Sequence, residues 1–305
     1  MPRTARQHWC AAFHFFIVLF SICRSAVSSR FDHSLRKANM KKILSFAIAI
    51  LSAALISGLA SGHAAAAQTS AAKESVEPVY AVLSLIGDKL SIVVAQSQTG
   101  TRVDANRRET LSISEDVFDT MAVSATAAAV RKLRPSAELA ALNTRSAVLF
   151  EKQRTLFEES GNTIAIPEPI RAALKNQNAT HLFLITKRID EAAAEFSSGT
   201  TDGKGKLEGL GFYLDGSIAT VDGASGNAGQ GFIAPFAYMN VMLIDLATSK
   251  IIKKQKITSS WPVSAGVAAT DIGSPWAALS SAEKVRLVNE LIRREIMRVV
   301  PDLMQ

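Results

Sequence analysis

The feature that most constrains this chain is a segment with the organisation of an export signal, placed well after the first residue. Residues 40–42 (Met-Lys-Lys) carry two positive charges, and residues 43–59 are apolar. Small residues then lead to Ala67, which precedes Gln68. A short cationic head, an apolar middle and an Ala-x-Ala end are typical of a secretory signal peptide. We therefore expect export, cleavage between Ala67 and Gln68, and a folded part that begins after them.

The alternative for residues 43–59 is a retained inner-membrane anchor, which needs about 20 strongly apolar residues. This run is shorter and rich in Ala, Ser and Gly, so we expect cleavage and a periplasmic location. Residues 1–39 precede a complete signal, and we interpret them as a non-native or disordered extension, with Met40 as the alternative start to Met1. Residues 68–78 form a polar linker.

Removing the leader changes the charge of the protein. The chain has 34 Lys/Arg and 27 Asp/Glu, of which residues 1–67 hold eight and one, leaving 26 of each. A basic protein would suggest nucleic acid or an anionic membrane as partner. The balanced charge of residues 68–305 removes that suggestion, so no nucleic-acid partner and no stable membrane insertion after cleavage are expected.

The leader also holds both cysteines, Cys10 and Cys23. The expected mature chain therefore has no disulfide, thiol nucleophile or cysteine-type zinc site. His181 is its one remaining histidine, and we interpret it as a capping or core residue. No metal and no cofactor are expected.

The pattern after the linker predicts alternating strands and helices. Gly87-Asp88 suits a hairpin turn, residues 102–113 extend that pairing, and Ser280-x-x-Glu283 forms a capping box. Strands are expected at 79–86, 90–95, 147–150, 181–186, 209–214, 238–246 and 250–260, and helices at 114–134, 151–159, 167–176 and 281–300. The order predicts an α/β or α+β fold, a mixed sheet with helices packed on it, in one domain spanning residues 79–300.

Residues 197–235 differ from the rest, because ten of the 17 glycines fall between Gly199 and Gly231. We expect a long flexible loop there, interrupted only by strand 209–214, and such a loop is functional or disordered. Aromatic and acidic residues gather in and around it, and they are the candidate binding residues, with core packing of the aromatics as the alternative. These candidates are Phe212, Tyr213, Asp215, Asp222, Phe232, Tyr238, Trp261 and Trp276.

Motifs for catalysis are incomplete. Gly203-x-Gly205-x-x-x-Gly209 misses the dinucleotide spacing, and residues 223–227 end in Asn where a nucleophile elbow needs Gly. Asp215, Asp222 and Asp271 lie in predicted loops and could pair for acid–base work, although turn chemistry explains the first two. No catalytic residue is assigned.

The helix at residues 167–177 leads through Asn178-Ala179-Thr180 into strand 181–186, and residues 240–252 form a hairpin with an Asp and a Thr-Ser-Lys turn. Together they resemble the α/β domain of the TolB amino-terminal region, the curli secretion lipoprotein and the outer-membrane activators of peptidoglycan synthases. The resemblance covers roughly residues 146–260 and the last helix. It implies an envelope assembly or accessory role. The lipid-carrying Cys of such lipoproteins is missing, since His63 stands in its place, and residues 197–235 form a long insertion.

We therefore expect a non-catalytic periplasmic or envelope accessory or binding protein, with another envelope protein or a small ligand as partner. The alternative is a periplasmic hydrolase that uses Ser or paired Asp residues of the Gly-rich region.

Overall fold

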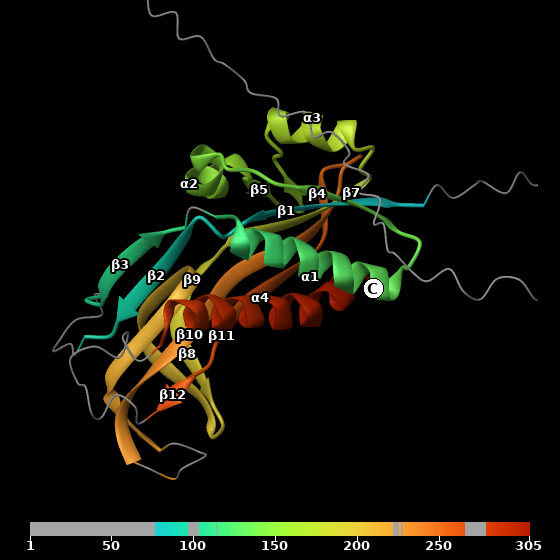
Figure 1. The fold of residues 1–305 in the computed structure, drawn as a ribbon. Coiled ribbons are helices and arrows are strands. Elements are labelled where there is room, and N and C mark those ends of the chain that lie inside the picture. Colours follow the sequence, from blue (N-terminus) through green and yellow to red (C-terminus); the bar gives the residue numbers. More distant parts are fainter. Residues whose placement is uncertain (1–76, 97–103, 114, 222–225, 227, 266–278) are drawn as a thin grey trace, which may run out of the picture. The chain divides into compact units, whose positions relative to one another are not determined.

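The computed structural model describes residues 77–96, 104–113, 115–221, 226, 228–265 and 279–305 (Figure 1). These residues belong to one compact unit, Ala72–Gln305. The predicted leader, its cleavage point at Ala67 and Gln68, and most of the predicted linker lie outside the described residues. Asp222, Asp271 and Trp276 lie outside them too.

The described residues form strands and four helices in an alternating order. The strands are β1 (Val79–Leu85), β2 (Lys89–Val94), β3 (Arg107–Ser112), β4 (Glu138–Leu142), β5 (Glu159–Ser160), β6 (Thr163–Ile164), β7 (His181–Lys187), β8 (Ile189–Phe196), β9 (Gly199–Val221), β10 (Ala228–Asp245), β11 (Lys250–Ser260) and β12 (Ser264–Ala265). The helices are α1 (Val117–Leu133), α2 (Ala147–Leu156), α3 (Glu168–Asn176) and α4 (Ser281–Leu303). None of them is long and apolar enough to span a membrane.

The sheet is mixed, as predicted. Strands β4, β1 and β7 are parallel neighbours in that order. Strand β10 runs antiparallel beside β7, and β11 runs antiparallel beside β10. The other half of β10 pairs with β9, which is followed by β2 and then β3. The predicted fold class, a mixed β-sheet with helices packed on it, is confirmed.

Two neighbouring lines of this sheet each consist of two strands placed end to end, and both lines are interrupted at the same level. In one line β1 is followed by β2, with a bend at Gly87 and Asp88 between them. In the next line β7 is followed by β9. Strand β10 runs along both of them, because its Met239 pairs with Lys187 of β7 and its Tyr238 pairs with Gly209 of β9. The predicted hairpin of residues 79–86 with 90–95 is therefore wrong. β1 pairs with β4 and β7, whereas β2 pairs with β3 and β9.

Between β7 and the sheet-forming part of β9 the chain makes a hairpin of residues 188–208. Strand β8 pairs there with the first part of β9, from Ile189 with Glu208 onwards. The backbone N–H of Gly209 donates to the carbonyl of Arg188 at 3.3 Å and closes the base of this β8–β9 hairpin. Gly209 has a φ of +67°, which favours glycine because a side chain is strained in that conformation.

Two tyrosines of the sheet hold this hairpin. The hydroxyl of Tyr238 donates to the Glu191 carbonyl and accepts the Ala193 N–H, both at 3.1 Å, where the β8–β9 register shifts. The hydroxyl of Tyr213 accepts the Lys204 N–H at 2.8 Å. Burial raises the pKa of each phenol to about 12. Both phenols therefore stay protonated at neutral pH and serve as fixed hydrogen-bonding groups.

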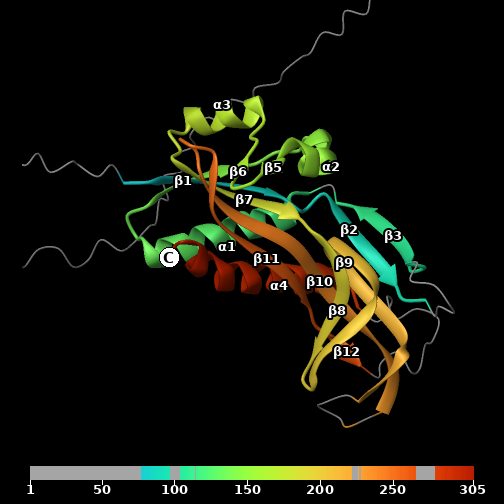
Figure 2. The same cartoon turned by 180° about the vertical axis from the view of Figure 1, so that it is seen from behind.

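Helices and the hairpin cover the sheet on its two faces. Helices α1 and α4 lie side by side on one face (Figure 1). Phe118, Val288 and Ile296 of these helices belong to one core cluster with strand residues such as Val82 and Phe183. On the other face α2 and α3 cover the parallel strands. The β8–β9 hairpin covers β2, β9 and β10 there (Figure 2). Because β7 is covered on both faces, its apolar run without alternation is explained.

The prediction of a flexible loop at residues 197–235 is wrong wherever the structure describes it. Strands β9 and β10 fill most of this region, and some of its glycines lie where strands pack closely. A Cβ on Gly211 would lie 1.9 Å from the Ser91 carbonyl oxygen and 2.6 Å from the Phe236 ring. Gly211 therefore allows its neighbouring strands to approach each other.

Other predicted elements are confirmed, with one correction. Helices α1, α3 and α4 and strands β7 and β11 lie close to their expected positions, and the Ser280–Glu283 capping box is formed. Strand β10 includes most of the strand expected at 238–246 but begins much earlier, at Ala228. Residues 147–150 are not a strand, because they form the first turn of α2. A short apolar run does not distinguish a strand from a buried helical turn by its pattern.

Candidate functional site

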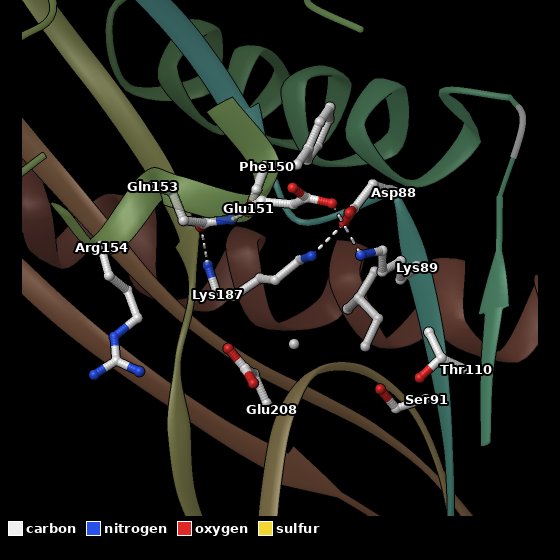
Figure 3. Close-up of a pocket in the computed structure, with 12 residues that line it drawn as sticks. Asp88, Lys89, Ser91, Thr110, Phe150, Glu151, Gln153, Arg154, Lys187 and Glu208 are labelled. Carbon is white, nitrogen blue, oxygen red and sulfur yellow. Dashed lines mark hydrogen bonds and ion pairs between the residues drawn. The ribbon is translucent and has the colours of Figure 1, made fainter. Parts of the chain in front are cut away.

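A cavity of about 320 Å³ lies where the two lines of the sheet break, between α2 and the base of the β8–β9 hairpin (Figure 3). It sits at the carboxyl ends of the parallel strands β1 and β7. In sheets with parallel strands this edge is where ligands commonly bind. Its lining comprises Asp88, Lys89, Ser91, Thr110, Phe150, Glu151, Gln153, Arg154, Lys187, Glu208, Gly209 and Leu210.

Gln153 holds the two parallel strands together where they separate. Its amide nitrogen donates to the Leu85 carbonyl at 3.0 Å, and its amide oxygen accepts the backbone N–H of Lys187 at 2.8 Å. Because the side chain is buried, no water molecule can take its place as the hydrogen-bond partner of these backbone groups. Gln153 therefore positions α2 and one wall of the cavity.

Asp119 of α1 holds the end of β1 from the other face of the sheet. Its carboxylate accepts the N–H groups of Ile86 at 3.0 Å and Gly87 at 3.1 Å. Burial raises the pKa of this carboxyl above its usual value, against the opposing effect of these hydrogen bonds. A Cβ on Gly87 would lie 2.6 Å from the Asp119 carboxylate oxygen, so the bend needs glycine.

Lys187 crosses the cavity from β7 toward Asp88, and the ammonium and carboxylate form an ion pair (Figure 3). The two side chains are only 13% and 17% exposed, so water screens this pair less than a surface pair. The ammonium also lies 6.0 Å from the centre of the Phe150 ring. Lys89 and Glu151 form a second, more exposed pair at 3.6 Å.

Other polar groups of the lining remain available to a ligand. Arg154 of α2 and Glu208 of β9 are exposed, and neither forms an ion pair with any described residue. Ser91 and Thr110, which are register partners on β2 and β3, add two hydroxyls on the side of the cavity opposite Arg154 (Figure 3). The cavity thus offers one unpaired charge of each sign, two hydroxyls and one aromatic wall.

A second cavity, of about 360 Å³, shares Gln153, Arg154 and Lys187 with the first and continues it across β7 and β10. Its lining includes Asn240, whose buried side-chain oxygen has no hydrogen-bond partner among the described residues. Arg188, which also lines it, is paired with Asp190. The two cavities together form a polar groove that crosses the strands along one edge of α2.

The aromatic candidates from the sequence lie elsewhere. Phe212, Tyr213, Phe232 and Tyr238 are almost completely buried in the core, and none lines a cavity described here. Trp261 is half-buried, with the Arg294 guanidinium 4.0 Å from its ring centre. Asp222 and Trp276 lie outside the described residues. Tyr213, Phe232 and Tyr238 form the packing between sheet and hairpin, whereas Phe212 belongs to the cluster under α1 and α4. Core packing is the alternative that the sequence left open.

Asp215 is buried and accepts from the backbone N–H and the hydroxyl of Ser217, at 2.8 and 2.6 Å. The Lys204 ammonium donates to the same hydroxyl at 3.1 Å. This Lys204–Ser217–Asp215 chain is the one group in the Gly-rich region that combines a hydroxyl with titratable partners among the described residues. It lines neither of the two cavities.

His181 lies at the start of β7, with its Nδ1 2.8 Å from the Thr180 hydroxyl and its ring stacked near Tyr80. Burial lowers the pKa of the imidazole, and the charge of Arg134 lowers it further, against the opposing charge of Asp245. A capping role at the strand end fits this environment. No cluster of metal-ligating side chains is found among the described residues.

The groove residues were missed by sequence reasoning, although one signal pointed to them. Asp88 and Lys187 each follow a buried apolar strand, and parallel strands bring such residues to one edge. The predicted β1–β2 hairpin concealed this, because it placed β1 and β7 in unrelated pairings. Gln153 had no signal, since its role depends on a helix that crosses two strand ends.

The fold and the groove define a mixed α/β domain with a polar cavity at the carboxyl ends of two parallel strands. No family model and no curated protein matches the chain. Among solved structures it is similar to protein XCC0632 from Xanthomonas campestris, of family DUF330, at 11% identity and a TM-score of 0.32, covering 75% of this chain and 85% of that one. It is also similar to hypothetical protein CT253 from Chlamydia trachomatis, at 14% identity and a TM-score of 0.27, covering 74% of this chain and 98% of that one.

Proposed function

We propose that this is an exported, non-catalytic binding protein of the bacterial envelope, which holds a small polar ligand in the cavity between α2 and the β8–β9 hairpin. The observation that carries the proposal is which charged side chains of that cavity are paired and which are not. Lys187 and Asp88 neutralise each other at its floor, whereas Arg154 and Glu208 stand unpaired on different walls. A preformed cavity with a few convergent polar groups is the usual form of a ligand site.

The same arrangement favours binding over catalysis. Lys187 is committed to Asp88, and Gln153 is committed to two backbone groups. The hydroxyls of Ser91 and Thr110 have no base within hydrogen-bonding reach among the described residues, and an activated nucleophile needs such a partner. Neither hydroxyl therefore has the partner that an activated nucleophile requires.

The unpaired groups indicate the chemistry of the ligand. Arg154 matches a carboxylate, Glu208 matches an ammonium group, and Phe150 adds an aromatic ring to the lining. A zwitterion such as an amino acid or a short peptide satisfies both charges at once. A singly charged compound would leave one of them unpaired.

Two arguments from the sequence support the envelope as the compartment. Residues 40–67 have the organisation of a signal peptide, and the resemblance to the TolB, curli-secretion and peptidoglycan-synthase activator type implies an accessory role there. Cell fractionation tests this part separately: the protein is expected in the periplasm with an amino terminus at Gln68. Recovery of the intact chain from the cytosol would contradict export.

Calorimetric titration with L-alanyl-L-alanine tests the ligand class. The dipeptide is expected to bind, and Arg154→Gln and Glu208→Gln are each expected to weaken binding at least about tenfold. Arg293→Gln, an exposed arginine of α4, is the matched control and should leave binding unchanged. Failure of the wild-type protein to bind the dipeptide, or equal binding by Arg154→Gln, would contradict the proposal.

A hydrolase remains the second candidate, because Lys204, Ser217 and Asp215 form a connected hydroxyl site. In that case Ser217 would be the nucleophile. Turnover of an ester from a hydrolase panel, lost in Ser217→Ala, would favour this candidate over the binding protein. The hydroxyl proton of Ser217 already points to Asp215, and no described cavity adjoins it, so we place this function second.

A further inference from the structure

Strand β4 is an edge strand with the composition of a central one. It pairs with β1 through Val79–Leu83, and no described strand lies along its other side. Its sequence, Glu-Leu-Ala-Ala-Leu, has a single charge at the first position. The unpaired side therefore presents backbone N–H and C=O groups next to a nearly uncharged run of side chains.

Both faces of β4 are partly covered. Leu139 packs against the cluster formed by α1 and α4, and Ala140 and Leu142 pack against the cluster formed by α2 and α3. These three side chains are half-buried, whereas Glu138 and Ala141 are exposed. One row of backbone groups of β4 has no partner among the described strands.

Apart from the two-residue β12, the other edges of the described sheet carry charged residues. β3 carries Arg107, Arg108 and Glu109; β8 carries Asp190, Glu191 and Glu195; and the lysines of β11 are Lys250, Lys253, Lys254 and Lys256. Charged side chains on an edge strand discourage pairing with another chain. Residues 139–142 have no such protection, so β4 is the edge at which strand addition is expected.

We propose that β4 pairs with β4 of a second copy of this chain, antiparallel and about a twofold axis at Ala140. In this register Ala140 faces Ala140 of the second copy, and Leu139 faces the smaller Ala141. Glu138 faces Leu142, so the one charge of the strand never meets itself. Large side chains oppose small ones, and two copies of the sheet become continuous.

Charge complementarity at the strand ends favours a second copy over an unrelated segment. Glu138 at the start of β4 and Arg145 just after its end are both exposed, and neither forms an ion pair with a described residue. Antiparallel pairing places the start of each strand beside the end of the other. Each interface would then bring Glu138 of either copy toward Arg145 of the other, twice by symmetry.

Light scattering on the purified protein over a range of concentrations tests the proposal. The expected mass is twice that of one chain. Ala141→Lys places a cation against Leu139 of the second copy and is expected to weaken dimerisation at least about tenfold. The matched control is Ala172→Lys, at an exposed position of α3, which should leave the dimer unchanged. Circular dichroism confirms that both variants fold.

A charge exchange tests the register. Glu138→Arg and Arg145→Glu are each expected to weaken the dimer about fivefold, and the double variant is expected to restore it. A monomer at all concentrations overturns the proposal, even if a different protein is found on β4. Equal weakening by Ala172→Lys, or a double variant weaker than both single variants, also overturns it.

Discussion

The side-chain oxygen of Gln153 lies 2.8 Å from the backbone nitrogen of Lys187, at the last residue of β7. The amide nitrogen of the same side chain reaches the Leu85 carbonyl, at the last residue of β1. A helix thus supplies, through one glutamine, the hydrogen bonds that two parallel strands lose where they separate. This contact forms one wall of the proposed ligand cavity.

Gln153→Ala is expected to destabilise the protein by about 2–4 kcal/mol, because it leaves two buried backbone groups without partners. Urea unfolding measures the change. Lys152→Ala, at the exposed neighbouring position of α2, is the control and should change stability by less than about 0.5 kcal/mol. Similar losses of stability in both variants would show that the Gln153 hydrogen bonds do not hold α2 and that its helix propensity alone stabilises it.

Gly87→Ala is expected to cost about 2–3 kcal/mol, because its Cβ would lie 2.6 Å from the buried Asp119 carboxylate. Gly216→Ala provides the comparison, since nothing lies within 4 Å of the Cβ it would add. Thermal unfolding should separate the two. An unchanged melting temperature in Gly87→Ala would contradict the close contact between the bend and α1.

Acid should weaken the α4–β11 contact, in which the Ser259 hydroxyl of β11 donates to the Glu295 carboxylate of α4 at 3.1 Å. Burial acts to raise the pKa of this carboxyl, but hydrogen bonds from Arg298 and Arg294, both at 2.9 Å, outweigh it and lower the pKa below its usual value. A lowered folded-state pKa gives stability that is present above the unfolded pKa and is lost as the pH falls through the folded one.

Glu295→Gln is therefore expected to lose about 1–3 kcal/mol near neutral pH and to differ less from wild type in acid, below the usual pKa of a glutamate. Denaturant unfolding across pH measures this. Glu290→Gln, in an exposed pair with Arg286, serves as control and should cost about 0.5 kcal/mol or less. A deficit of Glu295→Gln that stays constant down to low pH would contradict the assignment.

Alkali should loosen the β8–β9 hairpin. Tyr213 and Tyr238 have pKa values raised to about 12, and their ordinary value is 10. Between these values the folded protein binds more protons than the unfolded chain, so stability falls as pH rises through this window. Tyr213→Phe and Tyr238→Phe should each flatten that fall. Phenolate absorbance should show both groups ionising about two pH units late, and ionisation near 10 would contradict their burial.

Local signals were enough to predict the elements with strong patterns of their own. The capping box of α4, the buried run of β7 and the hairpin of β10 with β11 each depend on residues close in sequence. The mixed α/β class followed from their order. These features depend little on distant parts of the chain, which is why they agree with the structure.

The other features could not be predicted, because they depend on contacts between residues far apart in the sequence. Gly87-Asp88 has hairpin chemistry, but Asp119, more than thirty residues away, takes the backbone groups of the bend. The glycines of residues 197–235 suggested a loop, although Gly211 is there because Phe236 and Ser91 lie against it. The groove shares this origin, because Gln153, Lys187 and Asp88 come from three elements that meet only after the sheet is assembled.

The β8–β9 hairpin begins at Arg188 and returns at Gly209, and these two residues are joined by a hydrogen bond. Its departure and return points are therefore neighbours on one strand line. The segment between them can therefore become longer or shorter, or be replaced, without changing how the other strands are connected. Related domains are then expected to vary most in size at this junction, and an engineered insertion there should be tolerated.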